Sequence, residues 1–227
     1  SNNAFLATKI SFINSISNLC EKIPGANVDD IAKAIGLDPR IGPQFLKAGP
    51  GFGGSCLPKD LTSFINVYKS FDVSPMLLNS VKNVNEKQLE QILTILENKL
   101  KKISGKTISI LGLSFKENSD DIRESRSIKL IQNILKKNCV INVFDSLALE
   151  NTKQIFKNRL VYCNSISECL KNSDCAIIMN SEKNFKLISK QNILNMRRPL
   201  IIDSRRIIEQ KIKKIPELEY VALGINN

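Results

Sequence analysis

Hydrophobic residues recur at helical spacing through roughly the first hundred positions of the chain. Residues 5–23 place an apolar side chain every three or four positions, which predicts an amphipathic helix, and Pro24-Gly25 ends it. Asn27 can then cap a short second helix that has acidic residues in its first turn. The spacing returns over residues 58–71, and again from residue 78 to about 102 in a segment long enough to connect two lobes. This part of the chain is therefore predicted to be helical apart from its loops.

The pattern changes at Ser104-Gly105-Lys106, where short β-branched runs begin. Four runs, TISILG, VINVFD, CAIIM and PLIID, each lie beyond a helical stretch, and LVYC and YVALG could supply two further strands. Strands that alternate with helices predict parallel βαβ units in a doubly wound sheet. The predicted fold class is an all-α central domain, residues 1–103, followed by an α/β Rossmann-like domain with a mainly parallel sheet, residues 104–227.

Composition is that of an ordinary globular protein, with 42% hydrophobic and 24% charged residues. No apolar run reaches the length of a membrane span and no signal peptide opens the sequence, so we expect a cytoplasmic protein with no membrane contact. The formal net charge of +11 fits either an anionic partner or lysines that simply solvate the surface. Because the lysines are scattered and Trp is absent, nucleic-acid binding is not indicated.

The lack of histidine excludes several kinds of active site. Neither a Ser-His-Asp nor a Cys-His hydrolase can be built from this chain alone, and a His-ligated metal site is equally excluded. The six cysteines form no CxxC pair, so the sequence indicates neither a zinc site nor a disulfide framework, and we assign no metal site. Proton transfer must use Asp, Glu, Lys or water.

The stretch KAGPGFGGSCLPKDL, residues 47–61, is the strongest candidate for chemistry. Pro58 suits the first position of a helix, which places Cys56 at or just before a helix N-terminus, where the dipole and free amides stabilise a thiolate. Lys59 adds a positive charge, and Asp60 can orient a water or accept a proton. A glycine-rich turn with an incidental buried cysteine explains the spacing equally well. The loop lacks the GK[ST] ending of a P-loop.

Three segments resemble the UDP-glucose/GDP-mannose dehydrogenase family. They occur in the family's order: NAFLATKISFIN near the start, DPRIGPQFLKAGPGFGGSCLPKDL at residues 38–61, and ILGLSFKENSDDIRES at residues 110–125. The resemblance implies an NAD-dependent oxidoreductase that converts the C6 hydroxymethyl of a nucleotide-activated hexose to a carboxylate. The loop is nearer the branch that oxidises UDP-glucose, with GDP-mannose as the close alternative. UDP-N-acetyl-hexosamines fit less well, since loops of that branch depart further from GGSCLPKD.

The resemblance also implies that the family's N-terminal NAD-binding domain does not precede Ser1, so that the chain is a fragment. The family's catalytic lysine lies four residues before the asparagine that matches Asn3 and would fall upstream of this sequence. We therefore expect NAD to be bound mainly by the missing domain and the fragment alone to be inactive. A non-catalytic nucleotide-sugar-binding dimer is then a second description of the isolated fragment.

By the resemblance, Cys56, Asp60 and Asn3 are the catalytic residues. Cys56 would capture the intermediate aldehyde as a thiohemiacetal, and the thioester formed from it would be hydrolysed. Asp60 would hydrogen-bond the reacting oxygen or water, and Asn3 would stabilise the developing oxyanion. Lys59 and Arg123 match positions on the cofactor side.

Further positions match family residues that hold the nucleotide-sugar. Arg40 matches an arginine that reaches the sugar in a neighbouring subunit, which implies a homodimer joined through the helical domain. The other interpretations are a surface salt bridge for Arg40 and core packing for the two loop phenylalanines. Ser204, next to the matched position Arg205, replaces a glycine that is common in the family. The matched positions are Phe45, Leu46, Lys47, Phe52 and Gly53 in the loop, and Phe115, Lys116 and Arg205 in the second domain.

The second domain lacks the usual dinucleotide fingerprint. The turn after TISILG reads GLSFK without GxGxxG, whose glycines a dinucleotide pyrophosphate needs for close approach. Asp145, which ends VINVFD, stands where a Rossmann acid would bind a ribose. We interpret this aspartate as structural.

Overall fold

The computed structural model describes residues 1–208 and 210–226. The chain forms two compact units, one of Ser1–Gln91 with the C-terminal residues from Leu223, the other of Ile92–Ala222. The units divide within α4 (Met76–Leu100), a helix that is continuous across the division. The boundary that the sequence predicts near residue 104 lies between the end of α4 and the start of β1. That it separates two domains stays a prediction.

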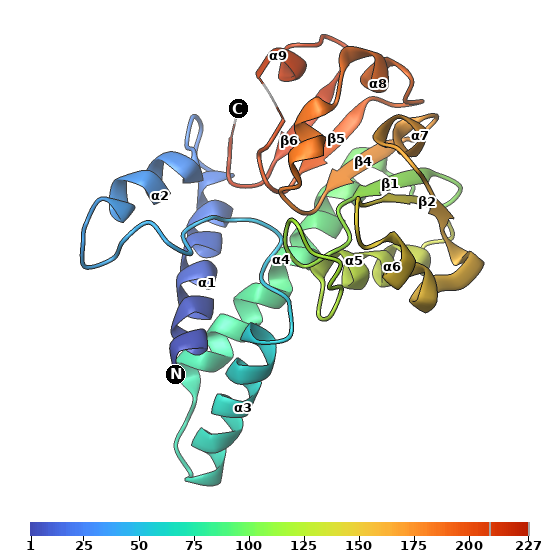
Figure 1. Ribbon diagram of the computed structural model, residues 1–227. Coiled ribbons are helices and arrows are strands. Elements are labelled where there is room, and N and C mark those ends of the chain that lie inside the picture. The colour runs from blue at the N-terminus through green and yellow to red at the C-terminus, as the bar shows by residue number, and fades with distance from the viewer. Residues whose placement is uncertain (209, 227) are drawn as a thin grey trace. The chain divides into compact units, whose positions relative to one another are not determined.

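The first unit is built from α1 (Asn2–Cys20), α2 (Val28–Gly36), α3 (Leu57–Ser70) and the first part of α4 (Figure 1). The predicted caps are present: the Asn27 side chain accepts a hydrogen bond from the Asp29 amide, and Pro58 lies in the first turn of α3. Two hydrophobic clusters fill the unit. One joins α1, α3 and α4 through residues such as Ala7, Leu61 and Val81, and the other joins α1 to α2.

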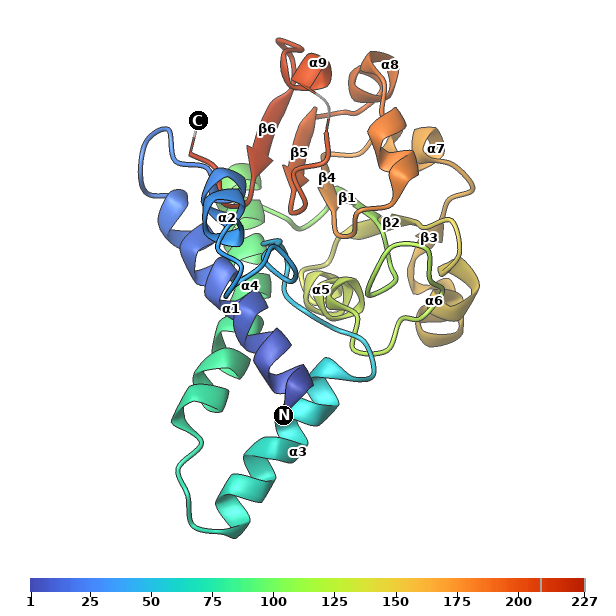
Figure 2. The ribbon, with the colours of Figure 1, turned by 60° about the vertical axis from the view of Figure 1, so that its left-hand side comes forward.

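Helices α1 and α4 run in the same direction in this unit (Figure 2). Ser11 Oγ donates to the Val81 carbonyl at 3.0 Å, and Gln88 Nε2 donates to Asn18 Oδ1 at 3.2 Å. Gln91 continues the series by donating to Glu21. All three pairs are separated by 70 residues, and such a constant offset requires a parallel pair.

The C-terminal residues close the helical unit, a feature that the hydrophobic pattern does not indicate. Ile225 forms an antiparallel bridge with Asn27, and the Gly224 amide donates to Glu21 Oε1 at 2.8 Å. Gly224 has a φ of +77°, and a Cβ atom there would lie 2.5 Å from Ser17 Oγ. A glycine is therefore required for this close approach.

The second unit contains a six-stranded parallel sheet in the order β3-β2-β1-β4-β5-β6. Every run proposed from the sequence forms one of its strands, which confirms the doubly wound α/β prediction. Their bounds are β1 (Thr107–Leu111), β2 (Val140–Phe144), β3 (Val161–Tyr162), β4 (Cys175–Ile178), β5 (Leu200–Asp203) and β6 (Glu219–Ala222).

Helices cover both faces of this sheet. One face packs against α7 (Ile166–Leu170), η2 (Lys183–Leu187), α8 (Lys190–Leu194) and α9 (Gln210–Lys213), whose buried side chains form one cluster with those of β1, β4 and β5. In both ribbon views α5 (Arg126–Leu135) and α6 (Leu149–Phe156), which η1 (Lys157–Arg159) follows, lie on the other side. The central strands are buried on both faces, which explains their continuous apolar runs. Within the described residues, no helix has the length and apolar character needed to cross a membrane.

Candidate active site

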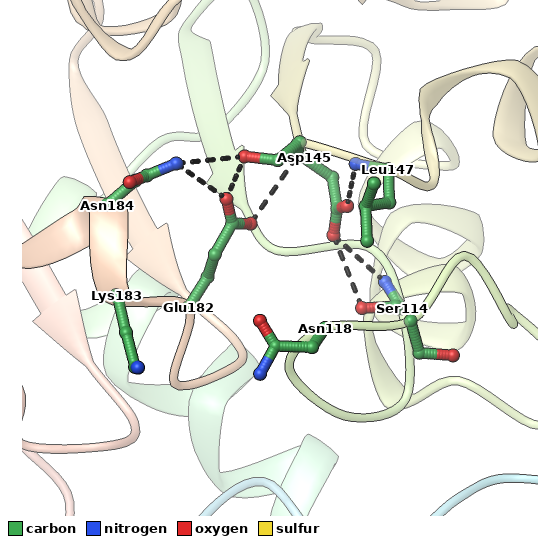
Figure 3. A pocket seen from close by; sticks show the side chains of 9 residues that line it. Ser114, Asn118, Asp145, Leu147, Glu182, Lys183 and Asn184 are labelled. Atoms are coloured by element: carbon green, nitrogen blue, oxygen red, sulfur yellow. Dashed lines mark hydrogen bonds between the residues drawn. The ribbon is translucent and has the colours of Figure 1, made fainter.

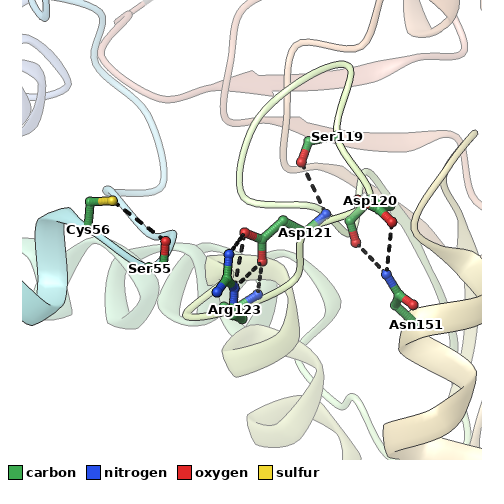
Figure 4. Close-up of polar contacts among 7 residues, drawn as sticks. All are labelled: Ser55, Cys56, Ser119, Asp120, Asp121, Arg123 and Asn151. Carbon is green, nitrogen blue, oxygen red and sulfur yellow. Dashed lines mark hydrogen bonds and ion pairs between the residues drawn. The ribbon is translucent and has the colours of Figure 1, made fainter.

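Cys56 lies at the N-terminus of α3, where the sequence predicted it. It occupies the N-cap position with its side chain exposed, and Pro58 follows in the first turn. The Asp60 amide donates to the Cys56 carbonyl at 2.9 Å, the first main-chain bond of the helix. Ser55 Oγ lies 3.6 Å from Cys56 Sγ, within hydrogen-bonding range for sulfur (Figure 4). The thiol is thus open to solvent at the N-terminal, positive end of the helix dipole.

The other five cysteines differ from Cys56 in exposure. Cys20, Cys163, Cys169 and Cys175 are buried, and Cys139 is half-buried. Burial raises the pKa of the thiols of Cys20, Cys139, Cys169 and Cys175, which keeps them protonated. A hydrogen bond from the Cys169 side chain lowers the pKa of Cys163, but that sulfur remains inside the core. The alternative that Cys56 is a buried cysteine is therefore wrong, while its catalytic role stays a prediction.

Asn3 and Asp60 meet although 57 residues separate them. Asn3 Nδ2 donates to Asp60 Oδ2 at 2.6 Å, which joins the first turn of α1 to the first turn of α3. Lys59 is exposed next to Asp60. Two of the three predicted catalytic side chains, Asn3 and Asp60, are therefore hydrogen-bonded to each other. The third, Cys56, lies one helical turn before Asp60, at the start of α3.

Side chains from α1 and α4 hold the loop that leads to Cys56. Asn14 Oδ1 accepts from the Gly49 amide at 2.9 Å, and Asn85 forms two hydrogen bonds with the main chain of Phe52. Lys9 Nζ donates to the Ile41 carbonyl at 2.8 Å. Residues 48–54 are buried, so the loop is part of the packed unit.

The predicted substrate residues of the loop fall into two groups. Leu46 and Phe52 are buried, and their side chains belong to the two hydrophobic clusters of the helical unit, while Gly53 is buried beside them. Phe45 and Lys47 are exposed. Phe45 also has a φ of +65°, a left-handed conformation that costs a bulky residue about 1–3 kcal/mol and often marks a functional position.

Arg40 is 87% exposed and paired with Asp38 at 2.6 Å. The hydrogen bonds from Arg40 hold the pKa of the Asp38 carboxyl below its usual value. Within one chain this is the surface salt bridge that the sequence allowed as an alternative. A role toward a neighbouring subunit stays a prediction.

In the second unit, Phe115, Lys116 and Arg205 follow the carboxyl ends of β1 and β5. Lys116 is exposed, with its Nζ 5.4 Å from the centre of the Phe115 ring. Arg205 is partly buried and its Nε donates to the Met179 carbonyl at 3.2 Å. Burial, assisted by the charge of Arg206, lowers the pKa of Arg205 to about 10. These cations stand at the edge where doubly wound sheets bind ligands.

Asp145 is structural, as we interpreted it. Its carboxylate is buried and accepts hydrogen bonds from the amides of Leu113, Ser114, Leu147 and Ala148 at 2.7–3.2 Å. Figure 3 shows the bonds from Ser114 and Leu147. These bonds tie the turn after β1 to the turn after β2. With both oxygens used in this way, the carboxylate has little capacity left for a ribose.

A pocket of about 310 Å³ lies beside this aspartate, at the carboxyl ends of β1, β2 and β4. Glu182 is buried in it and accepts from Ser146 Oγ, and Lys183 and Asn184 continue its wall (Figure 3). No pattern in the sequence had indicated these residues as part of a site. Their position directly after β4 could have indicated them, since parallel strands end at one edge.

Arg123 lies in the loop that follows β1 and pairs with Asp121 at 2.7 Å (Figure 4). This ion pair lowers the pKa of the Asp121 carboxyl. Both residues line a second pocket of about 470 Å³, together with Asn151 of α6. Among the residues that the structure describes, no group of three or more metal-binding side chains occurs.

Comparison with known proteins follows the same division of the chain. A model of the UDP-glucose/GDP-mannose dehydrogenase family, central domain, matches residues 1–87, and a model of that family's UDP binding domain matches residues 109–210. UDP-glucose 6-dehydrogenases of Rickettsia felis and Bacillus subtilis are 39% and 40% identical over 98% of this chain. The chain spans about half the length of these curated relatives, 50% in both cases.

Solved structures give the same result. A UDP-glucose dehydrogenase from Pyrobaculum islandicum matches with a TM-score of 0.89 at 30% identity, covering 99% of this chain and 49% of that one. A UDP-D-ManNAc dehydrogenase from Pyrococcus horikoshii, at 23% identity and a TM-score of 0.78, shares the fold over 98% of this chain and 50% of its own. Since two models of one family together cover most of the sequence, the chain belongs to the UDP-glucose/GDP-mannose dehydrogenase family, whose central and UDP-binding domains it comprises.

Proposed function

We propose that this chain is the central and nucleotide-sugar-binding part of an enzyme that oxidises UDP-glucose to UDP-glucuronate. The observation that carries the proposal is the exposed Cys56 at the N-terminus of α3, one turn before an Asp60 that is hydrogen-bonded to Asn3. The UDP-glucose 6-dehydrogenases among the relatives support the choice of substrate.

In the proposed mechanism Cys56 carries the intermediate between two oxidations. NAD, when bound, would supply the hydride acceptor for both two-electron oxidations, and Lys59 and Arg123 are the residues of this chain that would lie at its edge. The Cys56 sulfur adds to the C6 aldehyde and forms a thiohemiacetal, and loss of the second hydride leaves a thioester. Water then cleaves the carbon–sulfur bond, which releases the carboxylate and regenerates the thiol.

Asp60 and Asn3 act on the oxygen atoms in this scheme. The Asp60 carboxylate, one turn from the sulfur, orients the hydrolytic water and takes up its proton. The Asn3 amide has two N–H groups, one of which is bonded to Asp60. The other stabilises negative charge that develops on the sugar oxygen. The hydrogen bond between the Asn3 and Asp60 side chains fixes the orientation of both groups for these roles.

The nucleotide end is assigned to the second unit. Lys116 and Arg205 supply positive charge for a diphosphate, and the Phe115 ring offers a stacking surface for the base. Phe45, Lys47 and the buried Leu46, Phe52 and Gly53 form the loop that encloses the sugar. The charge of Lys116 and Arg205, their position after strand ends, and the exposure of Phe45 and Lys47 support the assignment.

NAD does not fit the Rossmann-like sheet of this chain. The Asp145 carboxylate is occupied by four main-chain amides, and a Cβ atom at Gly112 would lie 2.5 Å from the Asn180 side chain, so that turn is already filled. The exposed Lys59 and the surface guanidinium of Arg123 are the residues that we assign to the cofactor's edge, with the bulk of NAD held by a further domain.

We further propose that the chain forms a homodimer through its helical unit. Phe5, Phe12 and Leu19 recur every seven residues on α1 and are each more than half exposed, which makes an apolar stripe on this helix. Arg40, exposed at the same unit, would reach the substrate of the neighbouring subunit. Sedimentation of the purified chain tests this, with a monomer at micromolar concentration as the contrary result.

Two measurements test the proposed function. The fragment should form no NADH from UDP-glucose and NAD, while the enzyme completed by an N-terminal NAD-binding domain should do so. NADH formation by the fragment alone would contradict the proposal that a further domain is needed to bind NAD. By calorimetry the fragment should bind UDP more tightly than GDP. Tighter binding of GDP would favour the alternative substrate, GDP-mannose, and equal binding of the two would count against a uridine site in this chain.

A further inference from the structure

Two buried asparagines hold the main chain of the glycine-rich loop from two different helices. Asn14 of α1 has no exposed surface, and its Oδ1 accepts from the Gly49 amide at 2.9 Å. Asn85 of α4, also buried, accepts from the Phe52 amide at 2.7 Å through Oδ1 and donates to the Phe52 carbonyl at 3.1 Å through Nδ2. Both side chains thus satisfy main-chain groups that have no access to water.

The loop needs such external support. No helix or strand forms between Leu37 and Cys56, and Gly51 and Gly54 adopt positive φ angles of +102° and +84°. A glycine-rich segment loses more conformational freedom on ordering than any other. Its main-chain amides cannot be paired by a regular helix or ladder, so fixed side chains on the flanking helices take that role.

The consequence concerns the thiol. Phe52 lies four residues before Cys56, and the intervening Gly53 and Gly54 carry no side chain that could fix the chain's direction. Asn85 forms two hydrogen bonds with the main chain of Phe52. In the part of the chain that the structure describes, these are the last bonds from a side chain that hold the loop's main chain before Ser55. Displacement of this anchor would let the entry into α3 move, and the sulfur with it.

We propose that Asn14 and Asn85 are positioning residues of the Cys56 site, with Asn85 setting the approach of the chain to α3. They act through the loop's main chain and not on the sulfur. We call the three hydrogen bonds from Asn14 and Asn85 to the loop the clamp. The catalytic role of Cys56 rests on the proposed function, whereas the clamp does not.

Amide hydrogen exchange of the purified chain, read residue by residue by NMR, tests the clamp. In the wild-type chain the amides of Gly49 and Phe52 should exchange at least about tenfold more slowly than those of Gly51 and Gly53. Asn85→Leu should release the Phe52 amide and leave Gly49 protected, and Asn14→Leu should do the reverse. Equal exchange of all four amides in the wild type would overturn the proposal without any variant.

Asn83→Leu is the matched control, since Asn83 is exposed on the same helix two residues away. It should change neither amide. If Asn85→Leu does not fold, Asn85→Asp keeps an oxygen that can accept from the Phe52 amide and should keep that amide protected. Loss of protection at Phe52 in this variant would contradict the clamp.

The effect on the site is read from the alkylation of Cys56 by iodoacetamide at pH 7. Asn85→Leu should slow it at least about threefold relative to Asn83→Leu, because the thiol no longer has its fixed place at the helix N-terminus. Altered amide exchange with unchanged alkylation would show a structural clamp only and defeat the positioning role. A wild-type Cys56 no more reactive than the other cysteines, with the clamp intact, would instead count against the proposed function.

Discussion

Replacing Asp145 with asparagine tests whether this acid is a structural residue of the sheet unit. Its Oδ1 accepts from the amides of Leu147 and Ala148, and its Oδ2 accepts from those of Leu113 and Ser114. An asparagine can offer its oxygen to only one pair, and its NH₂ group then faces the other two donors. Two hydrogen bonds to a charged acceptor, at about 1.5–3 kcal/mol each, are lost. Asp145→Asn should therefore lower the unfolding free energy by about 3–6 kcal/mol, a large part of a typical domain's stability.

Urea unfolding followed by circular dichroism gives this loss as a midpoint shift of at least about 1 M. Asp120→Asn is the control, because Asp120 is exposed and its substitution should stay within about 0.5 kcal/mol of wild type. Calorimetric titration with UDP separates the two roles of Asp145. An Asp145→Asn chain of near wild-type stability that has lost UDP affinity would refute the structural assignment and indicate a ribose contact.

Three further predictions concern the turn after β1, the catalytic helix and the loop ion pair. Gly112→Ala should lower the free energy of unfolding by about 2–6 kcal/mol, because φ at this position is +92° and the new Cβ would meet Asn180. An unchanged midpoint of thermal unfolding would contradict this. Asp60→Ala should change stability by less than about 1 kcal/mol, since the carboxylate is exposed, yet lower kcat of the completed enzyme at least about 100-fold. Arg123→Gln should raise the pKa of Asp121 toward its ordinary value in an NMR titration. The pair's contribution to stability should be present above about pH 3.8 and disappear as pH falls through the lowered pKa; an unshifted titration would show that the pair is not formed in solution.

Local patterns in the sequence were sufficient for the elements of the fold. Each apolar run beyond residue 104 forms a strand of the parallel sheet, and the spacing of the first hundred residues forms helices with the expected cap at Asn27. Such signals are short-range, because side-chain period and capping are properties of neighbouring residues. The position of Cys56 at a helix N-terminus followed from Pro58 in the same way.

Contacts between distant residues could not be predicted from these patterns. The hydrogen bond between Asn3 and Asp60 and the clamp of Asn85 on Phe52 join residues 57 and 33 positions apart. The return of Gly224 to the helical unit depends on a close approach that no local period reveals. The resemblance to a family supplied roles for Asn3 and Asp60, but the clamps on the loop emerged only from the packed structure.

The central claim, that Cys56 is an activated nucleophile, is tested most directly by its alkylation in the folded and the urea-unfolded chain. Iodoacetamide labelling mapped by mass spectrometry gives the rate for each cysteine separately. Folded Cys56 should react at least about tenfold faster than the other five cysteines and faster than Cys56 of the unfolded chain, although unfolding exposes it fully. A folded Cys56 that reacts no faster than its unfolded counterpart would show that exposure alone explains its reactivity and that the thiol is not activated.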